Sequence, residues 1–459
     1  MFDCRCPHAP FSAETFNAAD ALFGRRAFLA GALGSLAALT LGQRAAAAEQ
    51  ITLLKSARLF DGLAMRTPGV CVLRGDRIVS LSAGDAGSGA RIVDLGDATL
   101  MPGLIDAHTH LSAPIATTTY LHALETPDKP LGDSVAEAAI LSVRNAQAML
   151  RNGFTTIRDV GGSSGIDLAM RNAVARGYVV GPRILASGVV LSITGGHGDR
   201  NELPDDVKLE RPSGVSYGPY GFREQVREHV KRHVDLIKIV ATGGVLSYGD
   251  VWNVPQFNLD EIQAVTEEAT KFGRIVAAHC HGDPGIALAV EGGCHSIEHC
   301  TGVSEKTLQA MAQRGTYLVP TIWALDSILQ PGNPNKIASG SLAKAHLAAE
   351  LRDDGMRRAL GSRVKFAYGT DAGVFPHREN NKDFALLGRM GMHPIDTLRS
   401  ATSWAAELLG TSDRGTIAAG KLADLVAFKG DPSANLGILE TAPALVMIGG
   451  KEIALATLG

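Results

Sequence analysis

The sequence lacks both an excess of one charge and a long basic run. Its 459 residues include 44 lysines and arginines and 47 aspartates and glutamates, which gives a formal net charge of −3 at pH 7. Nucleic-acid-binding proteins usually carry clustered positive charge, so nucleic acid is not an expected partner. Hydrophobic residues make up 45% and charged residues 20% of the chain, a balance typical of a globular protein.

The sequence also lacks any C-x-x-C pair. The six cysteines are Cys4, Cys6, Cys71, Cys280, Cys294 and Cys300. A chain of this length buries a large core and needs no disulfide framework to fold. Because free cysteines are usually buried, we expect Cys280 and Cys300 to be buried and reduced.

The apolar stretch near the N-terminus is too short and too diluted by glycine for a membrane span, which needs about 20 residues. It follows Arg25-Arg26 and precedes the small-residue cleavage site Ala46-Ala47-Ala48. The pattern is similar to a twin-arginine signal, although Gly24 stands where serine or threonine is usual. We therefore expect residues 1–48 to be a signal peptide for export to a bacterial periplasm, with no membrane span in the mature chain. A membrane anchor is the alternative.

Both ends of the remaining chain are rich in short apolar strands separated by turns. They are Ile51–Leu54, Val70–Leu73 and Arg77–Ser80 at one end, and Ala423–Phe428 and Ala444–Ile448 at the other. The pair Gly75-Asp76 is a turn signal between two of them. Two strand-rich ends around a different middle predict one small β-sandwich domain made of residues 49–102 and 416–459.

Residues 103–415 alternate short apolar strands with amphipathic helices. The eight predicted strands are Gly103–His110, Thr155–Asp159, Arg183–Ala186, Leu236–Ala241, Arg274–His279, Ser296–His299, Tyr317–Thr321 and Lys365–Gly369. The helix-like segments include Val135–Arg151, Phe222–His233, Leu259–Phe272 and Leu342–Leu360. This alternation predicts an α/β fold, a (β/α)8 TIM-like barrel. An open doubly wound sheet is the alternative, but the sequence shows no glycine-rich phosphate fingerprint to support it.

Metal-ligating residue types gather at the carboxyl ends of these predicted strands, where barrel active sites are built. They are His108 and His110 in the first strand, Lys238 in the fourth, His279 at the end of the fifth with His281 just after it, His299 in the sixth and Asp371 after the eighth. Side chains two apart on a strand point the same way, so His108 and His110 can bind one ion. Any single member has an ordinary structural explanation. The whole set predicts a metal site.

Lys238 lies in the apolar strand Leu236-Ile237-Lys238-Ile239-Val240. An ammonium is unfavourable there, and burial favours the neutral amine. A neutral amine can react with carbon dioxide to form a carbamate, an anionic group with two oxygens that can bridge two metals. The alternative is a lysine whose stem reaches solvent.

Several motifs together resemble the amidohydrolase superfamily over nearly the whole mature chain. They are Pro102–His110, the Lys238 strand, Ser296–His299, Gly369–Gly373 and Gly420–Val426. Three further motifs resemble the branch of metal-dependent Xaa-dipeptidases and prolidases, which includes ochratoxin-hydrolysing amidases. These are Thr194–Gly198, Ile237–Val245 and His279–Gly282. Two positions depart from that pattern: Cys280 replaces a common alanine, and Arg378 in His377-Arg378-Glu379-Asn380 replaces a common glycine.

The resemblance implies two divalent metal ions, expected to be zinc, and a role for each residue. His108, His110 and Asp371 would hold one ion, His279 and His299 the other, and carbamylated Lys238 would bridge them. Asp371 would also act as the catalytic base. We expect His197, Tyr248 and His281 to bind the substrate and take part in catalysis, and Arg378 to bind the substrate.

The expected activity is hydrolysis of the amide bond of dipeptides or N-acyl amino acids, including ochratoxin-type amides. The expected partners are a small-molecule amide or dipeptide substrate and further copies of the chain in a homo-oligomer. Lactone, phosphotriester and cyclic-amide hydrolysis and deamination are enzymatic alternatives, because fold does not fix substrate. Deaminases of the superfamily usually hold one metal and lack the bridging lysine, so Lys238 disfavours them. A degenerate barrel used for binding is the non-enzymatic alternative, but no expected ligand is missing.

Overall fold

The structure is a computed structural model that describes residues 50–112, 134–199, 201, 214–334 and 337–458. The account below concerns the compact unit that runs from Ile51 to Gly459. The predicted signal peptide, with Arg25, Arg26, Cys4 and Cys6, lies outside the described residues. None of the helices in the described part of the chain combines the length and apolar character that a membrane crossing requires.

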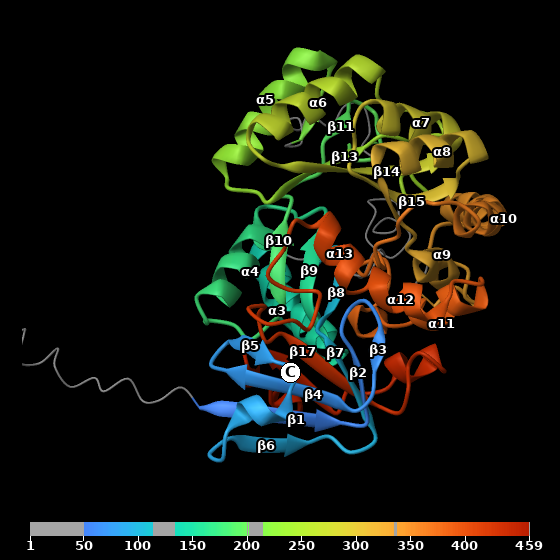
Figure 1. Ribbon diagram of the computed structural model, residues 1–459. Coiled ribbons are helices and arrows are strands. Elements are labelled where there is room, and N and C mark those ends of the chain that lie inside the picture. Colours follow the sequence, from blue (N-terminus) through green and yellow to red (C-terminus); the bar gives the residue numbers. More distant parts are fainter. Residues whose placement is uncertain (1–49, 113–133, 200, 202–213, 335–336, 459) are drawn as a thin grey trace, which may run out of the picture. The chain divides into compact units, whose positions relative to one another are not determined.

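Strands from both ends of the unit form two sheets (Figure 1). The first sheet has the order β5-β4-β1-β6 and the second the order β19-β18-β17-β7-β2-β3. The strands are β1 Ile51–Ser56, β2 Arg58–Phe60, β3 Met65–Arg66, β4 Gly69–Arg74, β5 Arg77–Ser80, β6 Arg91–Asp94, β7 Ala98–Pro102, β17 Leu425–Lys429, β18 Leu445–Ile448 and β19 Lys451–Glu452. Short 3-10 turns, η2 Ala83–Ala86, η4 Leu436–Glu440 and η5 Leu455–Thr457, accompany them.

The antiparallel pairing of β7 with β17 joins the two ends of the chain, with Leu100 opposite Ala427. Buried side chains from both sheets, among them Leu54, Leu73, Leu100 and Met447, pack in one apolar cluster. Two sheets that face each other across such a core form a β-sandwich, which confirms the small sheet region built from both ends. Its exact limits, residues 49–102 and 416–459, stay a prediction.

The middle of the chain forms the barrel, which confirms the predicted fold class. Its parallel strands are β8 Leu104–Thr109, β9 Phe154–Asp159, β10 Arg183–Ala186, β13 Leu236–Val240, β14 Ile275–Gly282, β15 Ser296–Gly302 and β16 Tyr317–Val319. The helices are α3 Val135–Arg151, α4 Ile166–Ala175, α5 Gly218–Lys231, α6 Leu259–Lys271, α7 Asp283–Glu291, α8 Glu305–Arg314, α9 Ile322–Ile328, α10 Ser339–Leu360, η3 His377–Glu379, α11 Asp383–Arg389, α12 Pro394–Ser400 and α13 Ser403–Leu408. The short pair β11 Ser192–Ile193 and β12 Val215–Ser216 stands apart from these strands.

Individual bridges close the ring between the two groups of barrel strands. Leu191 pairs with Ile239 of β13, and Thr109 of β8 pairs with Ala372. The prediction of a regular eighth strand at Lys365–Gly369 was wrong. This segment forms an isolated bridge from Phe366 to Leu318 and no continuous strand. Its main chain is hydrogen-bonded on both sides, with Ala107 N donating to Tyr368 O at 2.7 Å and Ala367 N donating to Leu318 O at 2.9 Å, but the pairing does not extend into a ladder.

Two of the predicted helices begin where the local sequence supplies a cap. Ser134 and Glu137 form a capping box at the start of α3, and Asn258 and Glu261 form another at the start of α6. Both helices begin at the predicted residues. Helix α5 begins earlier than predicted, because Pro219 occupies its first turn, where a missing N–H costs nothing.

Candidate metal centre

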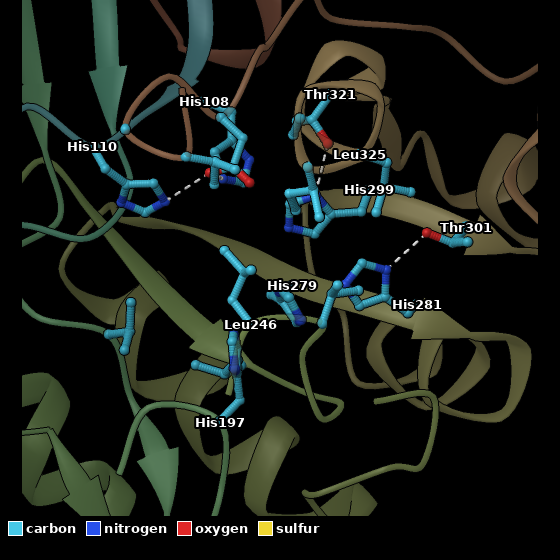
Figure 2. Close-up of a pocket in the computed structure, with 18 of the residues that line it drawn as sticks. His108, His110, His197, Leu246, His279, His281, His299, Thr301, Thr321 and Leu325 are labelled. Carbon is cyan, nitrogen blue, oxygen red and sulfur yellow. Dashed lines mark hydrogen bonds and ion pairs between the residues drawn. The ribbon is translucent and has the colours of Figure 1, made fainter. Parts of the chain in front are cut away.

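A cavity of about 240 Å³ lies at the carboxyl ends of the barrel strands. Figure 2 shows its labelled histidines pointing toward a common centre. The predicted site residues that line it are His108, His110, His197, Lys238, His279, His281, His299 and Asp371. Its volume suits a small molecule and excludes a folded polypeptide.

His108 and His110 contact the same carboxylate. The Nε2 atoms of the two rings lie 3.4 and 3.2 Å from Asp371 Oδ1. The other ring nitrogen of each donates elsewhere: His108 Nδ1 to Glu298 at 2.7 Å and His110 Nδ1 to Gly161 O at 3.3 Å. Both Nε2 atoms therefore face the cavity centre, as a shared ion would require.

His279, His281 and His299 form a second group, with ring nitrogens within 4.8 Å of one another. His299 also lies within that distance of His108 and Asp371, so it links the two groups. Nδ1 of His281 and Nδ1 of His299 are hydrogen-bonded to Thr301 Oγ1 and Thr321 Oγ1, at 2.8 and 2.7 Å. Outer partners of this kind orient metal-ligating imidazoles.

The charge state of most of these side chains fits a metal site, whereas at His110 the hydrogen bond and charge of Asp371 outweigh burial and raise the pKa. Burial lowers the pKa of His108 and holds the pKa values of His279 and His299 well below their usual range, so these imidazoles are neutral ligands at pH 7. Burial opposes ionisation of Asp371, but the neighbouring His108 and His110 outweigh it and hold the pKa of this carboxyl well below its usual range. Neutral imidazole with an ionised carboxylate is a donor set that divalent transition metals prefer.

Lys238 projects from β13 into the same cavity and is 3% exposed. Burial lowers its pKa to about 8, against the opposing effect of the Glu298 and Asp371 charges. Roughly a tenth of this amine is therefore neutral at pH 7, far more than for an ordinary lysine, and the neutral form is the one that can react with carbon dioxide.

A buried ion pair that sequence reasoning missed supports His108 from behind. Glu298 accepts a hydrogen bond from His108 Nδ1 and two from Arg158 Nη2, at 2.9 and 3.1 Å. Both charged side chains are fully buried. Burial opposes ionisation of Glu298, but the Arg158 charge and the His108 hydrogen bond lower its pKa to about 2. Arg158, like Lys238, is a cation on a fully buried barrel strand.

Several residues at the site hold left-handed backbone. The φ angles are 66° at His299, 65° at Asp371 and 48° at Thr321. Such angles are uncommon for residues other than glycine and concentrate at functional sites. At His299 and Asp371 the unusual backbone coincides with predicted metal ligands, where it helps to aim the side chain.

His197 is buried, with its ring 4.6 Å from that of His279. Its Nδ1 has no hydrogen-bond partner, and burial lowers its pKa to about 4. A Cβ on Gly244 would lie 2.0 Å from His197 Cε1, so the ring occupies the space that any other residue at position 244 would need. His197 is thus a neutral ring that lines the site and packs with its unpartnered Nδ1 against Gly244.

The structure does not bring Tyr248 and Arg378 into the cavity. Tyr248 is 53% exposed and is absent from the cavity lining. Arg378 is exposed on η3, and its main-chain oxygen accepts a hydrogen bond from Asn152 beside the end of α3. Each lies in a loop whose path the flanking motifs do not determine. Cys280 is fully buried as predicted, and its Sγ faces Gly285 O of α7 at 3.9 Å.

The model of the amidohydrolase family matches residues 99–453. The chain belongs to the amidohydrolase family. Ochratoxinase from Aspergillus niger is 29% identical over 426 residues, which cover 88% of this chain and 86% of that enzyme. A crystal structure of a Xaa-Pro dipeptidase with bound methionine in the active site is 34% identical, with a TM-score of 0.81, and covers 88% of this chain and 100% of the dipeptidase. A prolidase complexed with N-methylphosphonate-L-proline is 31% identical, with a TM-score of 0.79, over 88% and 99% of the two chains.

Family membership and the geometry agree on a coarse description. The chain is a hydrolase of the amidohydrolase family with a metal-binding histidine cluster at the mouth of its barrel. Among the described residues, Cys71, Cys280, Cys294 and Cys300 are free and buried, in agreement with the prediction for Cys280 and Cys300.

Proposed function

We propose that this protein is a binuclear metal-dependent amidase that hydrolyses dipeptides or N-acyl amino acids. The observation that carries the proposal is the convergence of five predicted ligands and one buried lysine on a single cavity: His108, His110, Lys238, His279, His299 and Asp371. A buried lysine amine among neutral imidazoles has little structural reason to be there. As a carbamate it would supply the anionic bridge that two neighbouring cations need.

His108, His110 and Asp371 would hold one ion, His279 and His299 the other, and carbamylated Lys238 both. Two bound ions supply Lewis-acid chemistry: they polarise the scissile carbonyl and lower the pKa of an attacking water. The chain's own part is orientation. The Glu298 and Thr321 hydrogen bonds fix the rings of His108 and His299, and such fixed rings keep the geometry constant through the reaction.

Asp371 is the proton carrier in this proposal. Its Oδ1 lies within hydrogen-bonding reach of the cavity histidines, so it can accept a proton from the attacking water and pass it to the leaving nitrogen. His281 and His197 line the same cavity. They would hydrogen-bond the developing oxyanion or the substrate carboxylate.

Three of the similar proteins support this substrate class. Two of the similar structures are named a Xaa-Pro dipeptidase and a prolidase, and one similar protein is named ochratoxinase. A deaminase or a lactone or cyclic-amide hydrolase of the same superfamily is the second candidate. The buried Lys238 favours the two-metal amidase over a one-metal deaminase.

The test is a screen of zinc-loaded protein against dipeptides and N-acyl amino acids, with lactones and aminated heterocycles in parallel. Metal content is measured on the same preparation by elemental analysis. We expect close to two ions per chain and turnover confined to the amides. Active protein with one ion or fewer, or turnover of the lactones or heterocycles alone, would refute the proposal.

A further inference from the structure

Much of the cavity is lined by aliphatic side chains for which the proposed mechanism has no use. These are Val190, Val240, Val245, Leu246, Pro320, Ala324, Leu325, Ile328 and Val374. Figure 2 shows Leu246 and Leu325 beside the histidines. Apolar surface at a substrate cavity gains free energy when an apolar group of the ligand covers it, so the lining carries information about the substrate.

Four of these side chains form one continuous surface, called the apolar wall: Val245, Leu246, Leu325 and Ile328. Val245 and Leu246 come from the loop after β13, and Leu325 and Ile328 from α9. Val245, Leu325 and Ile328 belong to one buried apolar cluster, and Leu246 packs against it. The wall is therefore a single packed unit built from two separate elements.

The loop half of the wall contains no helix or strand over residues 244–250, so side chains must hold it. Lys344 of α10 donates to Gly244 O, Ser247 O and Asp250 Oδ1, at 3.1, 2.7 and 2.8 Å. The Asp250 side chain is 4% exposed and also accepts from Gly244 N and Ser247 Oγ. All three ammonium protons of Lys344 are thus committed to this loop.

The helical half of the wall is anchored to the same helix. Arg352 of α10 donates to Ile322 O at 3.1 Å and to Asp326 Oδ1 at 2.5 Å, and both acceptors belong to α9. Its Nε also donates to Asp353 at 2.9 Å. Arg352 is therefore engaged in holding α9, although its side chain lines the cavity.

We propose that the apolar wall selects substrates with a bulky aliphatic or aromatic group next to the scissile amide, and that Lys344 is the positioning residue that fixes the wall. This inference rests on the proposed amidase function and names the substrate class within it. Two anchors on one rigid helix pre-organise the wall, so an apolar group meets a formed surface and little ordering cost opposes its binding.

Binding of the two halves of a cleaved amide tests the wall without relying on turnover. Calorimetric titration of the zinc-loaded protein compares phenylalanine with glycine, and phenylacetate with acetate. We expect the apolar member of at least one pair to bind roughly 10- to 100-fold more tightly, as burial of a large apolar side chain allows. Equal affinity within both pairs would overturn the proposal.

Variants test whether the apolar wall causes the preference for apolar ligands. Leu246→Asn and Leu325→Asn should each remove most of this preference. Leu347→Asn, at an exposed leucine of α10, is the matched control and should keep it. Two wall variants are used because one of them can fail to fold. If folded Leu246→Asn and Leu325→Asn proteins both keep the wild-type preference, the wall does not select.

The Lys344→Met variant tests whether Lys344 holds the apolar wall in position. It should weaken binding of the apolar ligand and raise KM for apolar amides, with zinc content and kcat near wild type, and Lys344→Arg should restore part of the loss. A purely structural lysine would instead affect apolar and small ligands equally. The results distinguish failure of the two proposals. Selective binding of apolar ligands without amide turnover would refute only the amidase function, and amide turnover without selectivity would refute only the role of the apolar wall.

Discussion

His108 Nδ1 donates a hydrogen bond of 2.7 Å to Glu298 Oε2, and Glu298 is held in turn by Arg158. This relationship fixes the tautomer of His108, because the proton on Nδ1 leaves Nε2 free to bind an ion. The ion pair lies in the barrel interior, where neither partner has access to water.

Replacing the carboxylate should therefore weaken metal binding. Glu298→Gln leaves the Arg158 charge uncompensated and can present its amide N–H to His108, so we expect about 10- to 100-fold lower zinc affinity. Competition with a chelator measures it. Glu291→Gln, at an exposed position of α7, is the control. Unchanged affinity in a folded Glu298→Gln protein would show that the ion pair has no influence on the site.

The same carboxylate predicts part of the acid sensitivity of the metal-free protein. The pKa of Glu298 is about 2 in the folded chain, below its ordinary 4.5. A lowered pKa stabilises the folded state above the unfolded value, and that contribution is lost as pH falls from 4.5 to about 2. Over this window the free energy of unfolding should fall more steeply for wild type than for Glu298→Gln, by up to about 1.4 kcal/mol per pH unit. Denaturant titrations at several pH values measure the slopes. Parallel slopes would contradict the prediction.

Lys238→Ala should lose both metal and activity, because the variant lacks the anionic bridge. Short carboxylic acids added to the variant should restore part of each by filling the gap. Lys238→Arg should fail, since a guanidinium stays protonated and cannot form a carbamate, whereas Lys238→Glu should keep some metal through its carboxylate. Lys231→Ala, at a solvent-exposed lysine of α5, is the control. A Lys238→Ala protein with two metals and near-normal turnover would require a different bridge.

Substrates should need a free α-carboxylate on the leaving amino acid. His197 and His281 are hydrogen-bonding groups inside the cavity, and a site built to bind a carboxylate leaves them unpaired when it is missing. We expect an N-acyl amino acid to exceed its C-terminal amide in kcat/KM by about 100-fold or more. Kinetics on matched pairs provide the measurement, and equal values for acid and amide would be incompatible with a carboxylate-reading site.

Export is predicted from Arg25-Arg26 and the alanine-rich junction. Lysine at both arginine positions should leave the precursor in the cytoplasm, and N-terminal sequencing of the exported wild type should start near Glu49. Fractionation of cells that express each form separates the outcomes. Unchanged export of the double variant would point to the general secretory route instead.

The barrel and the gathering of the metal-ligating residues were predictable because local rules determine them. Alternation along a strand places His108 and His110 on one side, and both contact Asp371. It also turns Cys280 away from the cavity toward α7. The eighth strand was not predictable as an irregular segment, since its apolar pattern is that of an ordinary strand.

The features that could not be predicted depend on contacts between residues far apart in the sequence. Glu298 belongs to a recognisable motif, but its partner Arg158 lies on β9, and no local pattern connects them. The same holds for Lys344 and Asp250, which hold the apolar wall. Tyr248 was expected in the site from the family resemblance, yet its side chain is exposed to solvent. Strand position is a local property, whereas loop conformation depends on anchors elsewhere in the chain.

The fit of the His197 ring over Gly244 limits which positions of this hydrolase can be varied to change its substrate. Even alanine at position 244 would place its methyl group where the imidazole lies. The smallest substitution at this position would therefore displace the His197 ring. Val245 and Leu246 follow directly in the chain and face the cavity. If the proposed function holds, libraries that randomise these two positions and leave position 244 untouched would vary substrate choice while keeping the His197 ring in place.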